Sequence, residues 1–262
     1  MELINFPRLA ASVLALSVLP LAGLAAPAVA GEVQKPLGVV EMFTSQGCSS
    51  CPKADAMFAE LARKGEVVAL AYHVDYWDYL GWKDTLASTE NTGRQYEYMR
   101  AFGAASVYTP QVVLNGRTHV SGSDGDAVQA GLQQMASSGE GMAVGIKVSR
   151  NADSIMIEPG PAAGPQAEAH VILVYFDPPQ PIEIDRGENK GQTVTYWNAV
   201  TGVYSAGMWH GTEARYELPA SEIAKKGEGG CAVLLQAVGE DDLPGPILGA
   251  ALISPPAPSG QE

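Results

Sequence analysis

The chain has 262 residues, of which 46% are hydrophobic, and a formal net charge of −13 at pH 7. Nucleic acids and anionic membrane surfaces both require a basic footprint, so this acidic composition argues against either as a partner. The length exceeds the common size of one domain, and the apolar content suffices for two hydrophobic cores. Three cysteines are too few for a disulfide scaffold.

Residues 1–30 have the features of a secretory signal peptide. Arg8 precedes an apolar stretch over residues 9–24, and Ala28-Val29-Ala30 is a small-x-small cleavage site. The apolar stretch is shorter than the ~20 residues that a membrane span needs. We therefore expect export to the periplasm or out of the cell, with no membrane span after cleavage; an uncleaved anchor helix is the alternative. Disulfides form and persist in those compartments.

The first two cysteines stand between a predicted strand and a predicted helix. Residues 37–44 are apolar and β-branched enough for a buried strand, and residues 52–63 repeat apolar side chains at helical spacing. A helix N-terminus lowers the pKa of a thiol, because its unpaired N–H groups favour an anion. We therefore predict that the pair cycles between dithiol and disulfide, with Cys48 as the exposed attacking thiol and Cys51 as the resolving thiol.

The rest of this half continues as a strand, a helix, a hairpin and a helix. They are expected over residues 67–72, 91–102, 111–121 and 124–137. This alternation of strands and helices predicts an α/β domain over residues 31–140.

Beyond residue 140 the helical pattern gives way to short β-like runs separated by Gly, Pro and Asn. These runs cover residues 144–148, 154–158, 169–176, 193–200, 214–218, 231–238 and 247–253. They predict an all-β, sandwich-like domain over residues 141–253 that folds by itself. Cys231 alternates with apolar residues in one run, so we expect a buried, inert thiol. Residues 254–262, rich in Pro and Ser, are expected to be disordered.

Other residues are candidates to serve the cysteine pair. Glu41 lies inside the apolar strand, where a carboxyl with a raised pKa can move the proton of the resolving thiol; a solvent-facing strand residue is the alternative. His73 ends the second strand on the edge where Cys48 emerges, so it could carry protons or join the cysteines in binding Cu(I); a structural histidine is the alternative. The aromatic residues within 76–82 suggest either a wall of the site or a satellite core.

A Cys-x-x-Cys after the first strand and a Thr-Pro before the hairpin resemble the thioredoxin superfamily. In that superfamily the proline is cis and packs against the active-site disulfide. The resemblance implies a thioredoxin-like fold for the first domain and a cis peptide bond at Pro110. It also implies that Thr109 offers backbone groups to an incoming peptide.

The chain more closely resembles the secreted bacterial family catalogued as domain of unknown function 1223. The motifs that carry the likeness are FTSQGCSSCP (residues 43–52), YHVDYWD (72–78), YTPQ (108–111), RGENKG (186–191) and YWN (196–198). That family also implies a thioredoxin-like fold, but no reaction. The chain departs from ordinary thioredoxins, since no Trp precedes Cys48, Ser49-Ser50 replaces Gly-Pro and Pro52 follows the second cysteine. These departures leave the reducing partner and the direction of exchange open.

Together these features predict an α/β thioredoxin-like domain followed by an all-β sandwich-like domain, in an exported thiol–disulfide oxidoreductase-like protein. Its partners would be protein or small-molecule thiols and disulfides, and its site residues are expected to be Cys48, Cys51, Thr109, Pro110 and Glu41. This chemistry needs no cofactor. One alternative is a copper-binding protein that uses Cys48, Cys51 and His73, and another is a binding module with a structural disulfide. The oligomeric state stays open.

Overall fold

The computed structural model describes residue 1 and residues 29–151, 153–162, 168–226 and 228–254. The signal peptide predicted over residues 1–30 and the tail predicted over residues 254–262 lie outside the described residues except at their edges. Within the described part of the chain, no helix is long and apolar enough to cross a membrane.

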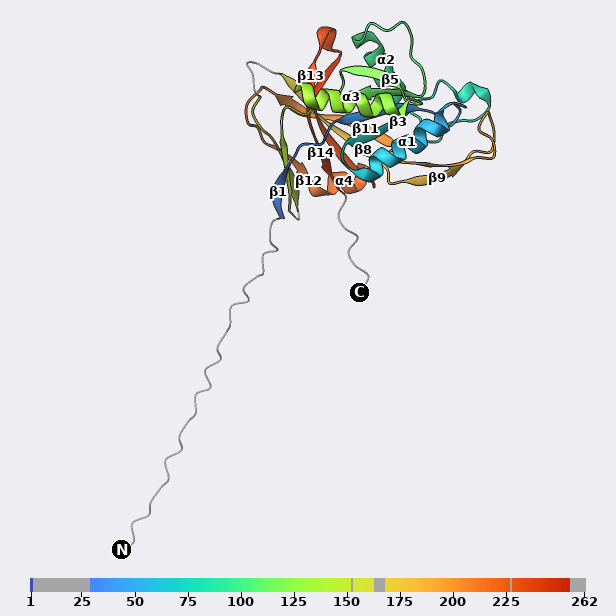
Figure 1. The fold of residues 1–262 in the computed structure, drawn as a ribbon. Helices are drawn as coiled ribbons and strands as arrows, with labels where there is room; N and C mark the ends of the chain where they lie inside the picture. Colours follow the sequence, from blue (N-terminus) through green and yellow to red (C-terminus); the bar gives the residue numbers. More distant parts are fainter. Residues whose placement is uncertain (2–28, 152, 163–167, 227, 255–262) are drawn as a thin grey trace.

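The described residues form strands in four sheets, with four α-helices and two short 3-10 helices around them (Figure 1). The helices are α1 (Cys51–Lys64), α2 (Thr89–Ala101), α3 (Gly125–Ser138) and α4 (Ala220–Lys226), and the 3-10 helices are η1 (Asp78–Leu80) and η2 (Glu240–Asp242). The strands are β1 (Val29–Gln34), β2 (Val39–Thr44), β3 (Val68–His73), β4 (Gln111–Leu114), β5 (Thr118–Ser121), β6 (Ile146–Arg150), β7 (Ser154–Pro159), β8 (Ala169–Phe176), β9 (Gln180–Glu183), β10 (Thr193–Tyr196), β11 (Val200–Trp209), β12 (Tyr216–Pro219), β13 (Gly230–Val238) and β14 (Pro244–Ile253).

The sheet that positions the cysteines has the strand order β3-β2-β4-β5, in which only β2 and β3 run parallel. Strands β2 and β3 are buried along their whole lengths, and successive side chains point to opposite faces. One face packs against α1 and α3 through, among others, Val40, Met42, Ala69 and Ala71. The other face packs against α2 and the C-terminal strands through Val39, Phe43, Val68, Leu70 and Tyr72.

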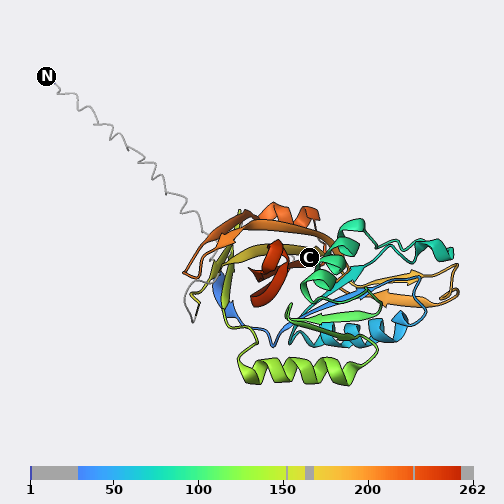
Figure 2. The same cartoon turned by 90° about the horizontal axis from the view of Figure 1, so that it is seen from above.

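The sheet β11-β8-β13-β14 has a core on each of its faces. One face meets β2 and β3 through Val174, Phe176, Ala232 and Leu234. The other face meets the sheet β1-β6-β7-β12 through Val171, Leu173, Tyr175, Val233 and Leu235. The molecule is therefore layered, with α1 and α3 on one side of the first sheet and two further sheets stacked beyond its other side (Figure 2).

The expected α/β thioredoxin-like domain followed by a separate all-β sandwich-like domain is wrong. The protein is mostly β, and although three of its four sheets lie on one side of the predicted limit near residue 140, the sheet β1-β6-β7-β12 crosses it. Strand β1 pairs with β6 of the other half, and the two-stranded hairpin β9-β10 lies beside α1 (Figure 1). The physical reason is that β2 and β3 are apolar on both faces, and the C-terminal strands cover the face that α1 and α3 leave open.

Most elements of the N-terminal half begin and end close to their predicted limits. Helix α1 carries Pro52 in its first turn and ends at Gly65, whose left-handed φ of 69° suits a glycine. The β4-β5 turn has Asn115 and Gly116 at φ 50° and 62°, as the Asn-Gly signal predicts for a tight hairpin. In the C-terminal half, the run expected over residues 193–200 is instead divided between β10 and β11 by Asn198, which has a φ of 49°.

Candidate functional site

The cysteine pair forms a disulfide at the start of α1. Cys48 and Cys51 are joined by an S–S bond of 2.13 Å, and their Cα atoms lie 5.4 Å apart. Cys51 is the first residue of α1, and its N–H donates to the carbonyl of Cys48 at 3.1 Å. The third cysteine, Cys231, is free and buried, and burial raises the pKa of its thiol to about 12. A thiol with that pKa is a poor nucleophile at neutral pH.

The Thr109–Pro110 segment lies beside the disulfide. The Ser50 Oγ is 3.4 Å from the Cys48 Sγ and donates to the carbonyl oxygen of Thr109 at 3.5 Å. The Thr109–Pro110 peptide bond is cis, as the thioredoxin resemblance implied. Trp77 donates from its indole nitrogen to the Thr109 Oγ1 at 2.8 Å. The structure thus brings Cys48, Cys51 and Thr109 together and adds Ser50 and Trp77 to the set.

Cys48 is less accessible than the sequence predicted, since its exposed fraction is only 1%. The loop between β9 and β10 reaches the cysteine loop through Asn189, which is itself buried. Its side-chain amide donates to the carbonyl oxygens of Gln46 and Cys48, each at 2.9 Å. The C-terminal half of the chain therefore holds one side of the disulfide loop.

Replacing Asn189 with alanine is expected to loosen this cover. The Gln46 carbonyl would lose its side-chain donor and the Cys48 carbonyl would keep only the Cys51 N–H, which costs about 1–3 kcal/mol of unfolding free energy. Reduction of the disulfide by dithiothreitol should become faster, because the cysteine loop loses its anchor. Glu188→Ala, an exposed change in the same loop, should alter neither the unfolding curve nor the reduction rate. Equal reduction rates for the two variants would contradict a covering role for Asn189.

Part of the aromatic segment over residues 76–82 lines the disulfide loop. Gly47 approaches Trp77 so closely that a Cβ on the glycine would lie 3.1 Å from the tryptophan Cβ. Trp82 donates to the side-chain oxygen of Gln46 at 2.8 Å. Tyr79 is 79% exposed. The segment therefore supplies two tryptophans to the wall of the site and one tyrosine to the surface.

A buried group of five polar side chains, four of them titratable, lies next to the disulfide loop, where Asp84 accepts from the Gln46 N–H at 2.8 Å. Thr44, at the end of β2, donates to the Asp55 Oδ1 at 2.8 Å, and His73 Nδ1 lies 2.8 Å from the Asp84 Oδ2. The ring of Tyr196 packs edge-on against the His73 imidazole, with 4.7 Å between ring centroids. All five side chains are nearly or fully buried.

The two carboxyl groups in this cluster have opposite pKa shifts. Burial raises the pKa of Asp55 to about 7, although nearby His73 and the hydrogen bond from Thr44 act in the lowering direction. Burial would also raise the pKa of Asp84, but His73 and the backbone N–H groups of Gln46 and Leu86 outweigh it and lower that pKa. Asp84 is therefore a carboxylate at neutral pH, whereas Asp55 can hold or release a proton there.

The structure places Glu41 in a different environment from the one expected for a proton carrier. Its Oε1 accepts from the Arg94 Nε at 2.8 Å, and its Oε2 accepts from the hydroxyl of Tyr98. Arg94 also donates to Gln236 of β13 at 3.0 Å. Glu41 thus anchors α2 between the first sheet and the C-terminal strands, and within the described residues it forms no hydrogen bond with the cysteines.

The copper alternative needs His73 beside both sulfurs. His73 is fully buried and uses its Nδ1 on Asp84. Within the described residues, no group of three or more His, Cys, Asp or Glu side chains is close enough to hold a metal ion. The copper alternative stays a prediction.

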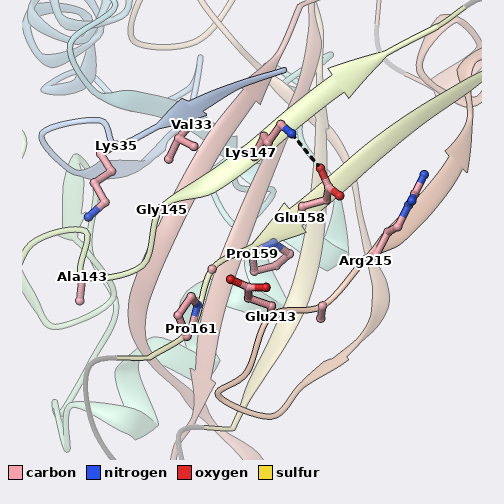
Figure 3. Close-up of a pocket in the computed structure, with 12 residues that line it drawn as sticks. Val33, Lys35, Ala143, Gly145, Lys147, Glu158, Pro159, Pro161, Glu213 and Arg215 are labelled. Carbon is pink, nitrogen blue, oxygen red and sulfur yellow. Dashed lines mark ion pairs between the residues drawn. The ribbon is translucent and has the colours of Figure 1, made fainter. Parts of the chain in front are cut away.

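An open cavity of about 700 Å³ lies on the outer sheet, away from the cysteine loop (Figure 3). Its lining includes Lys35 and Arg215, and Lys147 pairs with Glu158 at 3.6 Å. No predicted site residue lines it.

Sequence reasoning did not select Asp55, Asn189 or Tyr196 as site residues. Asp55 had a visible signal, because it lies four residues after Cys51 and next to the apolar Ala54 in a predicted helix, where an acid is out of place. Asn189 and Tyr196 belong to motifs that carry the family likeness. Only the folded structure shows that Asn189 contacts the cysteine loop and that Tyr196 packs against His73.

The fold and the site together define a mostly β protein with a disulfide at a helix start and two buried acids next to the disulfide loop. A family model described as "Protein of unknown function (DUF1223)" matches residues 39–236, and the chain belongs to this family. A crystal structure of a protein from Agrobacterium tumefaciens is similar, with 43% sequence identity and a TM-score of 0.78. The match covers 87% of this chain and 98% of that one. No curated protein matches the chain.

Proposed function

We propose that this protein is an exported thiol–disulfide oxidoreductase. The observation that carries the proposal is a disulfide at the start of α1 whose first sulfur lies 3.4 Å from an exposed serine hydroxyl. A thiolate at Cys48 would be stabilised by the Ser50 hydroxyl and by the positive end of the α1 dipole. Export through the signal peptide expected over residues 1–30 would place the pair where disulfides persist.

The proposed reaction is a two-step exchange. In the reduced protein, the Cys48 thiolate attacks a substrate disulfide, one substrate thiolate leaves, and a mixed disulfide with Cys48 forms. Cys51 then loses its proton and attacks the Cys48 sulfur, which releases the second substrate thiolate and closes the Cys48–Cys51 bond. The substrate is reduced by two electrons and the protein is oxidised by two, and the reverse sequence oxidises a dithiol.

The surroundings support a protein or small-molecule partner entering from the serine side. Ser49 and Ser50 are exposed, whereas Asn189 and Trp77 enclose other sides of the loop. On the open side, the carbonyl of the partly exposed Thr109 accepts from the Ser50 hydroxyl, whose oxygen lies 3.4 Å from the Cys48 sulfur. Backbone groups of an extended peptide can pair with such a segment.

The experiment that tests this function measures the reduction potential of the Cys48–Cys51 pair against glutathione buffers. We expect a value between about −270 and −120 mV, the range of known dithiol oxidoreductases. In the reduced protein, iodoacetamide should modify Cys48 before Cys51 and well before the buried Cys231. A potential below about −300 mV would mark a structural disulfide and end the enzyme proposal.

A further inference from the structure

Asp55 is buried in an arrangement that does not compensate its charge. Its exposed fraction is 3%, its Oδ1 has only the neutral Thr44 hydroxyl, and its Oδ2 has no partner within the described residues. The titratable groups that face it are His73 from β3, Asp84 from the connection before α2, and Tyr196 from β10. Burying a carboxyl without a full set of partners is costly, and such groups gather at functional sites.

The position of Asp55 on α1 directs it to the resolving cysteine. Residues four apart on a helix lie on one face with about 5–6 Å between their Cβ atoms, so Asp55 and Cys51 are neighbours. Each Cα–Cβ bond leans toward the helix N-terminus, which tilts Asp55 toward the turn that contains Cys51. Both side chains are buried, and Thr44 holds the carboxyl from β2.

We infer that Asp55 exchanges a proton with the Cys51 sulfur whenever the Cys48–Cys51 bond breaks or forms. His73, which is held by a hydrogen bond to Asp84, alters the electrostatic environment of Asp55. His73 and Asp84 are therefore positioning residues. The inference rests on the proposed function and deepens it, because it assigns the proton of the resolving thiol to a residue other than Glu41.

The proton and electron balance is simple in both directions. During reduction, an incoming thiolate attacks the Cys48 sulfur, the S–S bond breaks, and its electron pair stays on Cys51 as a thiolate. As that thiolate forms, Asp55 transfers its proton to it and becomes a carboxylate. During oxidation, the Asp55 carboxylate removes the Cys51 proton, and the resulting thiolate attacks the Cys48 sulfur in the mixed disulfide with the substrate, which forms the Cys48–Cys51 bond and releases the substrate thiolate.

The neighbours of Asp55 are suited to hold it ready for both steps. With a pKa of about 7, the carboxyl is present in both protonation states near neutral pH, which suits a group that must act as acid and base. The Asp84 carboxylate can only accept hydrogen bonds, so the His73 Nδ1 donates to it. The other ring nitrogen of His73, Nε2, has no partner within the described residues.

The decisive test compares wild-type protein with Asp55→Asn as a function of pH in both directions. For reduction by dithiothreitol, the ratio of wild-type to variant rates should reach about 100 on the acid side and fall as pH rises through about 7. For oxidation of the reduced protein by glutathione disulfide, the ratio should instead rise through the same pH. The reagent's own thiolate content cancels in each ratio, and a purely structural role would not reverse its pH dependence between directions.

Two further variants keep the test specific. Asp126→Asn removes an exposed carboxylate in the first turn of α3, and its profiles should match the wild type. His73→Gln should move the inflection to higher pH, because His73 lowers the pKa of Asp55. If the ratio of wild-type to Asp55→Asn rates does not depend on pH for either reduction or oxidation, the inference is overturned. A potential below about −300 mV would defeat the proposed function alone, since the dithiothreitol profile would still report on the proton.

Unfolding as a function of pH checks that Asp55 is protonated in the fold. Its pKa rises from 3.8 to about 7 on folding, so its stabilising contribution is complete below about pH 4 and is lost as pH rises through 7. The stability of the wild type relative to Asp55→Asn should therefore fall across that window. Asp55→Asn should fold well, because it removes a buried charge without changing the side chain's shape. A difference that does not vary with pH would show that Asp55 titrates normally, and would remove the basis for its proton role.

Discussion

Replacing Arg94 with methionine is expected to lower the free energy of unfolding by about 3–5 kcal/mol. Arg94 is 9% exposed and lies 2.7 Å from the fully buried Glu41 carboxylate. It also donates to Tyr98 and Gln236, and its guanidinium lies 5.0 Å from the centre of the Tyr98 ring. Without Arg94, Glu41 would keep a buried charge with no cation beside it. Urea unfolding followed by circular dichroism measures the loss.

Two comparison variants separate the buried charge from the lost packing. Arg100→Met changes an exposed arginine at the end of the same helix and should cost at most about 0.5 kcal/mol. Combining Arg94→Met with Glu41→Leu removes both charges and should recover much of the loss, since a buried pair can often be replaced by apolar side chains. If the double variant is less stable than Arg94→Met alone, the uncompensated Glu41 carboxylate is not the cause of the stability loss in Arg94→Met.

The fragment over residues 142–253 is expected to remain unfolded when it is expressed alone. Sequence patterning predicted an independent β domain, but the structure gives this segment a core shared with β2 and β3. Hydrogen bonds also cross between the halves, including Ile247 N–H to the Asn115 carbonyl and Asn198 Nδ2 to the Ala69 carbonyl. The fragment would expose the apolar face that normally covers the first sheet. Thermal unfolding should therefore show no cooperative transition.

The matched control is the chain over residues 29–253, which keeps every strand of the four sheets. It should unfold cooperatively under the same conditions. A mixture of fragments 29–140 and 142–253 should regain a transition, because each half supplies the missing face of the other's core. A sharp transition from the 142–253 fragment alone would restore the two-domain view.

Local signals predicted the elements around the cysteines well. The apolar run before Cys48, the proline after Cys51 and the glycine at residue 65 bound a strand and a helix that the structure contains. Asn115-Gly116 predicted the hairpin turn, because these residue types tolerate the positive φ angles that the turn requires. The pair expected to cycle between dithiol and disulfide is a disulfide in the structure.

The site was predicted only in part. Glu41 was chosen because a carboxyl in an apolar strand is unusual, yet its neighbour in the structure is Arg94, which lies 53 residues away in the sequence. Asp55 was passed over, although the same reasoning applies to an acid on the apolar face of a helix. To decide between Glu41 and Asp55, one must know which side chains face each carboxyl.

By itself the sequence determined the local features of this protein: the strand, the disulfide and the helix of residues 39–64, and the turn that pairs β4 with β5. These depend on neighbours within a few residues, where backbone preference and spacing act directly. Only the tertiary structure decided the rest. Apolar periodicity shows that a strand face must be covered, but not what covers it. The stacking of the C-terminal sheet on β2 and β3, the contact of Asn189 with Cys48 and the burial of Asp55 beside His73 all depend on such long-range packing.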